Sequence, residues 1–357
     1  MSAAQQPATP LDAIRRASAY DRTIRMRGTD ANALMKKYLP AIHFRKELLF
    51  DNMLNGITCV FDDYPIHYPI PGNSERVKYT LDLLRKNLKR NEKIYIRYGA
   101  SRTLKRLSVR EVLERWERGK SRFGVTDLHF RETNYFEKVD ADSISYFNLL
   151  PLFSDEVSFL EMLTLVISST GIFSDSHSDD GDGSNHCIVG KKLWFAWDKE
   201  EGQRAGLQDC TYENIFDQAR FSIKKFLGLK SGHWFLVSEG QTLFMPGNFT
   251  HKVITLENYI GFGSFYVSFP NYVNSLKRWI LKNSTDVTPE FIDEMNRQCL
   301  RFIKREKLRK GTNQLSKMGY DYFKTAVGSW KEGLTGEEVG RMEEKISLAK
   351  LFAEVGR

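Results

Sequence analysis

The stretch GQTLFMPGNFTH, residues 240–251, determines how the middle of this chain folds. Thr242–Met245 is a run of β-branched, aromatic and other apolar residues, and Pro246 with Gly247 gives a turn signal. The stretch therefore predicts one strand, a tight turn and a second strand that opens with His251.

Runs of the same kind flank this stretch on both sides. They are rich in aromatic and β-branched residues, and breaks that contain Gly, Asn, Asp or Pro separate them. Many short strands with turn signals between them predict an antiparallel sandwich or barrel over residues 138–271. The flanking runs are Leu163–Ser168, Leu193–Trp197, His233–Val237, Lys252–Leu256 and Ile260–Val267.

The part of the chain before the β-rich segment has two regions. Residues 1–18 are small and polar, and they predict a disordered tail. Residues 19–137 predict a mixed α/β region that packs on the barrel. Within it, Lys93–Tyr98 alternates charge and bulk like a strand, and the capping-box spacing of SVRE at 108–111 predicts a helix near 109–118.

The part of the chain after the β-rich segment, residues 272–357, predicts helices. The Thr-Pro pair at 288–289 is typical of a helix start, and TGEE at 335–338 has the spacing of a second capping box. We expect these helices to pack on the barrel or on a partner subunit, which makes a homodimer one hypothesis. The apolar stripe after the second box consists of Val339, Met342, Ile346 and Ala349.

The composition is that of an ordinary globular protein. Of the 357 residues, 41% are hydrophobic and 27% are charged, and the formal net charge is +8. Four scattered cysteines form no CxxC pair, which argues against a zinc ribbon and favours reduced thiols in a nuclear or cytoplasmic compartment. We expect no secretory signal and no membrane contact, because no suitable apolar segment is present.

Two basic segments are candidate contacts for a binding partner. One lies at 85–93 and the other at 301–310, and each offers a weak contact to chromatin or nucleic acid. Neither is interleaved with aromatic residues as a groove for single strands is, and a solvated helix face is the more common role of such runs.

The motif SDSHSDDG, residues 174–181, carries the main chemical signal. On an extended strand His177 and Asp179 point to one face, because side chains alternate with a period of two. His251 follows 72 residues after Asp179 (251 − 179). Two histidines and one carboxylate form a facial triad that leaves iron positions open for a 2-oxo acid and dioxygen. These residues are therefore candidate metal ligands, although a lone His-x-Asp pair is more often structural.

A cosubstrate with a distal carboxylate needs a cation near such a metal. Lys191 and Lys192 follow Gly190 and precede an aromatic run, with Lys192 fifteen residues beyond His177 (192 − 177). Only one of two adjacent lysines on a strand can face inward. A surface lysine that snorkels into water is the alternative role. The hydroxyl of Ser174 could share the same carboxylate.

Together these motifs resemble the JmjC (Jumonji C) family of Fe(II)- and 2-oxoglutarate-dependent oxygenases. His-x-Asp, then Gly-x-Lys before an aromatic strand, then GQTLFMP and His251, are especially similar to the F-box-linked and PHD-finger-linked JmjC lysine demethylases. The likeness is strong over 160–268 and faint over 104–150, where Asn148 matches a polar position near the iron.

The resemblance implies a double-stranded β-helix (jelly-roll or cupin-like) in which His177, Asp179 and His251 hold Fe(II). It selects Lys192, with Ser174 in place of a family threonine, to anchor 2-oxoglutarate. The implied activity couples decarboxylation of 2-oxoglutarate by O2 to hydroxylation of a C–H bond. On an N-methyl group this hydroxylation yields formaldehyde and the demethylated amine. The expected substrate is a protein N-methyl-lysine, with a histone tail as the first choice.

Two other functions stay open. One is a hydroxylase of a protein side chain, an RNA or a small molecule, and the other is a catalytically silent chromatin scaffold. The chain shows no PHD finger, CXXC zinc module or F-box, and its loop at 179–184 is compact and acidic. The presence of all three metal ligands favours catalysis over the scaffold. His186 and His233 lie near the motifs but fit none of them, so we expect them to pack or to form hydrogen bonds.

Overall fold

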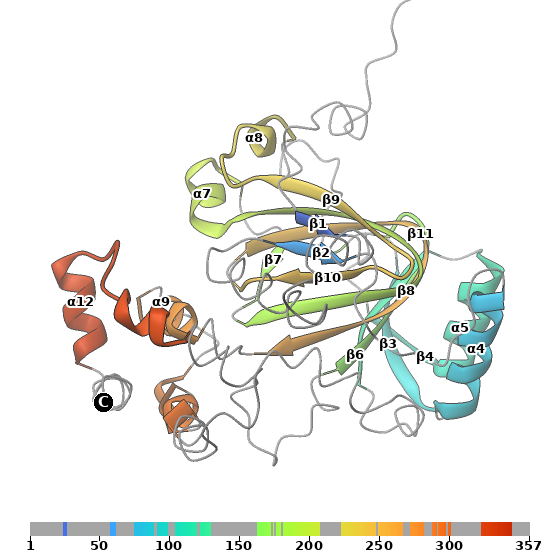
Figure 1. The fold of residues 1–357 in the computed structure, drawn as a ribbon. Coiled ribbons are helices and arrows are strands. Elements are labelled where there is room, and N and C mark those ends of the chain that lie inside the picture. The colour runs from blue at the N-terminus through green and yellow to red at the C-terminus, as the bar shows by residue number, and fades with distance from the viewer. Residues whose placement is uncertain are drawn as a thin grey trace, which may run out of the picture.

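The structure, a computed structural model, has a mostly antiparallel sheet with flanking helices (Figure 1). This confirms the prediction of a mainly β core. The tail at 1–18, Asn148 and the basic segment at 301–310 lie outside the described residues. The structure describes residues 24–26, 58–61, 75–88, 91–98, 104–119, 122–129, 163–172, 174, 176–179, 181–207, 223–247, 249–266, 272–281, 288–290, 292–297, 299–300 and 323–344.

In the described part of the chain, eleven strands form a single sheet in the order β1-β2-β10-β8-β11-β6-β5-β3-β4, with β7 paired to β11 and β9 paired to β8. Among the described pairings only β1 with β2 is parallel, and the described strands do not close into a barrel. The strands are β1 (Ile24–Met26), β2 (Cys59–Phe61), β3 (Lys93–Tyr98), β4 (Leu104–Ser108), β5 (Phe123–His129), β6 (Leu163–Ser168), β7 (His177–Ser178), β8 (Asp182–Asp198), β9 (His233–Ser238), β10 (Thr242–Met245) and β11 (Phe249–Tyr266).

The predicted helix starts are confirmed. Both capping boxes form, at Ser108 with Glu111 and at Thr335 with Glu338, and the Ile292 N–H donates to the Thr288 carbonyl at 3.1 Å. No helix in the described part of the chain is long and apolar enough to cross a membrane. The helices with defined bounds are α4 (Arg76–Asn87), α5 (Val109–Arg118), α7 (Lys199–Arg204), α8 (Ile223–Leu227), α9 (Tyr272–Leu281) and α12 (Gly336–Glu343).

Two long strands, β8 and β11, form the centre of the sheet. The sequence predicted two separate strands at 252–256 and 260–267, and this was wrong, because β11 runs without a break through Glu257 and Asn258. The break signal instead marks register shifts in its pairing with β8. At the same level β8 bends at Gly190, where φ is 92° and a Cβ would collide with the Asn258 carbonyl.

The pairing of β9, β8 and β11 gives this part of the sheet two distinct faces. Residues directly opposite one another share a side, so the side chain of His251 lies on the same face as that of Ala196. We call this side the His251 face. Its members are His233, Phe235 and Val237 of β9, Lys192, Trp194 and Ala196 of β8, and His251, Val253 and Thr255 of β11.

Both faces of the central strands are covered, which explains why most residues of β8 are buried and none is exposed. On the His251 face, Trp194 and Val253 belong to one apolar cluster, which also contains Val60 of β2. On the opposite face, Phe195 and Trp197 pack with Phe226 of α8 in a second cluster.

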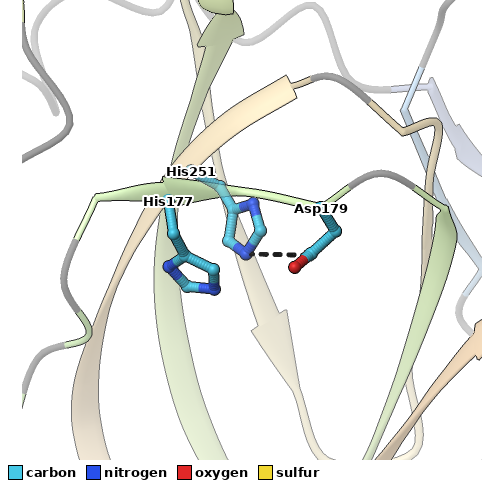
Figure 2. Close-up of side chains that lie close together, drawn as sticks. All are labelled: His177, Asp179 and His251. Atoms are coloured by element: carbon cyan, nitrogen blue, oxygen red, sulfur yellow. Dashed lines mark ion pairs between the residues drawn. The ribbon is translucent and has the colours of Figure 1, made fainter. Parts of the chain in front are cut away.

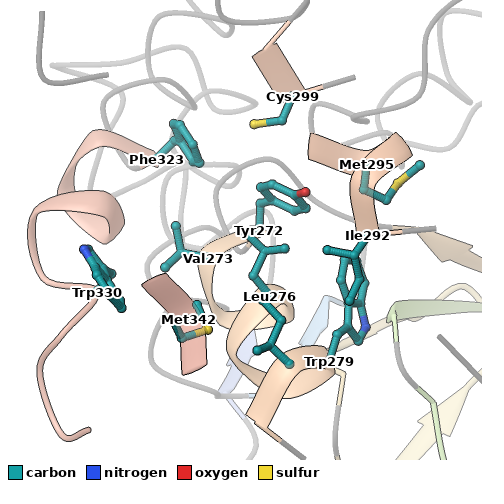
Figure 3. Close-up of a cluster of buried hydrophobic side chains, with 11 residues drawn as sticks. Tyr272, Val273, Leu276, Trp279, Ile292, Met295, Cys299, Phe323, Trp330 and Met342 are labelled. Carbon is teal, nitrogen blue, oxygen red and sulfur yellow. The ribbon is translucent and has the colours of Figure 1, made fainter. Parts of the chain in front are cut away.

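The C-terminal helices have an apolar core of their own (Figure 3). Tyr272 and Leu276 of α9 are fully buried in it, and Met342 of α12 reaches it from the predicted apolar stripe. The next stripe positions, Ile346 and Ala349, lie outside the described residues.

A buried carboxylate joins these helices to the sheet. Asp182, at the start of β8, has no solvent exposure. Its Oδ1 accepts the Gly247 N–H at 3.1 Å and lies 3.9 Å from the guanidinium of Arg278 on α9. Arg278 also donates to Ser275 at 2.8 Å. Asp182 therefore fixes both the turn before β11 and the position of α9.

We expect Asp182→Ala to lower the free energy of unfolding by about 2–4 kcal/mol, because it leaves a buried N–H and a partly buried guanidinium without this acceptor. Urea unfolding followed by circular dichroism measures the change. Glu343→Ala is the matched control, since the pair of Glu343 with Lys331 is exposed and should be worth at most about 1 kcal/mol. Equal losses in both variants would contradict the role assigned to Asp182.

Candidate metal centre

His177, Asp179 and His251 converge at one end of the His251 face (Figure 2). One ligand atom from each residue lies within 4.8 Å of the other two. The His251 Nε2 is 3.8 Å from the Asp179 Oδ2, and the ring centroids of the two histidines are 4.2 Å apart. In the described part of the chain no other group of three His, Cys, Asp or Glu side chains is arranged in this way.

Strand pairing brings the two histidine ligands together. His177 of β7 pairs directly with His251 of β11. Beyond this pair the Ser174 N–H donates to the Val253 carbonyl at 2.9 Å. Asp179 then follows His177 by two residues and returns to the same side.

Hydrogen bonding and burial keep His251 ready to bind a metal. Its Nδ1 lies 3.3 Å from the Phe249 carbonyl, which favours the tautomer that leaves Nε2 without a proton. Burial lowers the pKa of His251 well below its usual range, and the nearby His177 lowers it further. A neutral imidazole is the form that a metal ion needs.

The donor set suits a divalent transition metal. Two imidazole nitrogens and one carboxylate oxygen fit the facial arrangement that leaves several coordination positions open. His177 is exposed, Asp179 is partly buried and His251 is buried, so the cluster opens to solvent on the His177 side. A substrate can approach from that side while the sheet shields the other.

The structure separates the roles of the two adjacent lysines. Lys191 points outward and pairs with the exposed Glu257 at 2.8 Å. Lys192 is only 7% exposed and lies on the His251 face. Its Nζ stands 4.0 Å from the centroid of the Tyr259 ring, and burial lowers its pKa to about 7. Lys192 is therefore a buried amine whose described polar surroundings include no carboxylate partner.

Two residues of this site were not identified from the sequence. Trp194 lies between Lys192 and His251 on the His251 face, with its ring centroid 5.6 Å from that of His251. Its indole N–H is buried and has no acceptor in the structure. Tyr259 supports Lys192 and donates its hydroxyl to Asn185 at 2.5 Å. Alternation from Lys192 could have predicted Trp194, whereas Tyr259 depends on the irregular register of β11.

Ser174 is hydrogen-bonded to the backbone of Val253, a residue of the His251 face. Its hydroxyl oxygen accepts the Val253 N–H at 3.0 Å, which leaves the hydroxyl proton free to donate to a ligand. The predicted role of Ser174 at a cosubstrate carboxylate stays a prediction.

His186 and His233 form hydrogen bonds, as expected. His186 Nδ1 lies 2.7 Å from the Thr242 hydroxyl, and burial lowers the pKa of His186 to about 3. His233 Nδ1 lies 2.9 Å from the Ser231 carbonyl, and its ring packs against Phe235 and Phe249.

Comparison with known proteins adds no relative. No protein-family model matches the chain, and no curated protein matches it. Assignment of the site therefore rests on its geometry and on the motif resemblance.

We expect the protein to bind Mn2+, a redox-stable divalent transition metal, at this cluster. Asp179→Ala should weaken binding at least about 100-fold, because loss of a direct ligand exceeds the effect of losing an outer hydrogen-bond partner. Isothermal titration calorimetry measures the affinity. Glu257→Ala removes an exposed carboxylate and should leave the affinity unchanged. If Asp179→Ala binds Mn2+ as tightly as the natural chain, the cluster is not the metal site.

Proposed function

We propose that the protein is an Fe(II)- and 2-oxoglutarate-dependent oxygenase of the JmjC type, built on a double-stranded β-helix. The observation that carries the proposal is a metal-ligand triad and a buried lysine on one face of the sheet. His251 lies opposite Ala196, and Thr255 lies opposite Lys192, four residues further along both strands. This separation is about 13 Å between backbones. A dicarboxylate bound by the metal at one end and by the amine of Lys192 at the other suits that spacing.

The buried amine of Lys192 supports a carboxylate ligand. A lysine in an apolar environment destabilises the fold unless an anion compensates it. Its aromatic partner, Tyr259, offers only a weak attraction for the charged form. The distal carboxylate of 2-oxoglutarate would supply the missing charge, which explains why a cation is kept at this position.

The remaining polar groups of the His251 face orient the same ligand. The indole N–H of Trp194, a residue on the same face as Lys192 and His251, is buried without an acceptor among the described residues, and a bound oxygen would satisfy it. The Ser174 hydroxyl proton is a second donor nearby. Apolar neighbours such as Val253 exclude water from the face. Bound Fe(II), with O2 and 2-oxoglutarate, would supply the oxidising power for C–H hydroxylation.

A protein N-methyl-lysine is the substrate class that we assign to this oxygenase. The support is the likeness of GQTLFMP and His251 to the lysine demethylases. Aromatic rings also stand beside the triad, with Phe249 and His233 in contact at a centroid distance of 5.7 Å. Aromatic faces attract a methylammonium group.

Turnover of 2-oxoglutarate tests the proposal. With Fe(II) and ascorbate the purified protein should form succinate, and His177→Ala should reduce succinate to background. Among methylated histone peptides, one should increase succinate and release formaldehyde in equal amount. Glu257→Ala serves as the active control.

The outcomes separate the candidate functions. Succinate with a mass gain of one oxygen on the substrate and no formaldehyde would replace demethylation by stable hydroxylation. Absence of succinate with every substrate, despite metal binding, would overturn the oxygenase and favour a scaffold. A scaffold should also keep its partners in a pull-down with His177→Ala.

The affinity for 2-oxoglutarate should depend on pH through Lys192. Burial sets the pKa of the free amine at about 7, so the charged form that attracts a carboxylate is lost as the pH rises above 7. The affinity should fall by up to about tenfold per pH unit above that value. Calorimetry with the Mn2+-loaded protein measures how the 2-oxoglutarate affinity changes with pH. The range is about pH 6.5 to about pH 8.5, chosen to span the pKa of Lys192.

Two substitutions control this measurement. Lys192→Arg keeps a permanent charge and should remove the pH slope. Lys192→Met should abolish 2-oxoglutarate binding but keep Mn2+, and it should raise the free energy of unfolding by about 1–2 kcal/mol because a buried amine is replaced by an apolar chain. Unchanged 2-oxoglutarate affinity in Lys192→Met would remove Lys192 from the site.

A further inference from the structure

The hairpin of β3 and β4 has an unusual charge distribution. Residues 93–108 contain five Lys or Arg (at 93, 97, 102, 105 and 106) and no Asp or Glu. The hairpin lies at the end of the sheet beside α4 and α5 (Figure 1). The hairpin does not pair with any strand of the metal site, since β5 and β6 lie between it and β11 in the sheet.

The register of the hairpin sorts its side chains onto two faces. Tyr95 pairs with Arg106, and Lys93 pairs with Ser108, so these residues share one side. Ile94 and Ile96 point to the other side and are buried. We call the side with Lys93, Tyr95 and Arg106 the hairpin face.

An aromatic ring is exposed at the centre of the hairpin face. Tyr95 is 58% exposed, the highest value among the large hydrophobic side chains described, where the only other exposed one is Val77 at 40%. The Arg106 guanidinium lies 5.2 Å from the Tyr95 ring centroid. This contact holds the ring and places a planar cation beside it.

The cations of this face differ from those on the neighbouring helices. On α5, Arg110 is 2.9 Å from Glu114, and on α4, Arg85 is 2.6 Å from Glu117, so these charges are neutralised locally. Among the described residues no carboxylate forms an ion pair with Arg106 or with Lys93. Glu111, whose pKa the charge of Lys93 helps to lower, is hydrogen-bonded to the Ser108 cap instead.

Protection of a sheet edge is the alternative explanation of these charges. The sheet order ends at β4, and basic residues on an edge strand prevent pairing with other chains. This accounts for Arg106 on β4. It does not account for Tyr95, which lies on the inner strand β3 and exposes an aromatic ring where a polar residue would serve better.

We propose that the hairpin face binds single-stranded nucleic acid. Lys93 and Arg106 contact backbone phosphates, and the Tyr95 ring stacks on a base. Cations supply affinity for a polyanion, and an exposed ring accepts any base because every base has a flat aromatic face. Lys93 ends the basic segment at 85–93 noticed in the sequence, and the hairpin face adds to it the exposed aromatic ring that the segment lacks. It is independent of the metal centre, so neither assignment depends on the other.

Fluorescence anisotropy with the full chain tests the proposal. The probes are fluorescein-labelled oligouridylate and oligothymidylate of about 20 nucleotides, which is longer than the stretch of nucleotides that one small domain covers. Tyr95→Ala should weaken binding roughly 5- to 150-fold, which corresponds to the stacking of one base, while Tyr95→Phe should bind like the natural chain. The ratio of the two probe affinities identifies RNA or DNA as the preferred strand.

A matched pair of charge variants separates local recognition from general attraction. Lys93→Gln with Arg106→Gln should weaken binding and reduce the slope of log affinity against log salt by about 1.4, for two lost phosphate contacts. Arg110→Gln with Arg118→Gln removes the same charge from the ion-paired surface of α5 and should have little effect. Melting curves establish that each variant is folded.

Several results would overturn the proposal. These are no binding by the natural chain at low salt, equal losses in the two double variants, or full binding by Tyr95→Ala. Tighter binding to a duplex of the same length would also reject it. So would hairpin-face variants that lose binding to anionic phosphatidylserine vesicles but keep their binding to oligonucleotides.

Discussion

The register between β8 and β11 is the constraint on which the rest of the structure depends. It places His251 opposite Ala196 and Thr255 opposite Lys192, so a ligand histidine and a buried lysine point to the same side. A register slip of one residue in either strand would move that strand's side chains from the His251 face to the opposite face, among the residues that pack on α8. Because apolar clusters cover both faces, such a slip would also bury the wrong side chains. The core and the site therefore specify the same register.

Irregularities in the pairing of β8 and β11 bring residues from distant parts of the two strands together at the site. The bend at Gly190 and the register shifts after Thr255 allow the second half of β11 to turn, and Tyr259 then reaches the amine of Lys192. On the other side of β11, the pairing with β7 is regular and places His177 directly opposite His251. Glycine at 190 is required for close approach to the Asn258 carbonyl rather than for freedom alone.

Local rules account for most of what the sequence could predict. Alternation on a strand joins His177 to Asp179, and capping chemistry located the starts of α5 and α12. The choice between Lys191 and Lys192 needed a family pattern, and burial in the structure agrees with it. Apart from the place of His251 beside His177 and Asp179, contacts between segments distant in the sequence could not be predicted. The continuity of β11 and the support of Lys192 by Tyr259 depend on strand pairing, which a single sequence does not display.

Buried polar groups that are unusual in a protein core lie together on the His251 face, and this is the strongest physical reason to regard that face as functional. An apolar face gains nothing from a buried amine at Lys192 or from an indole N–H at Trp194 that has no acceptor. A methionine and a phenylalanine would pack there at lower cost. Such local conflicts persist where a ligand resolves them, and here both groups share a face of the sheet with a cluster of three potential metal ligands. An anion that reaches from the metal toward Lys192 would satisfy all of these groups at once.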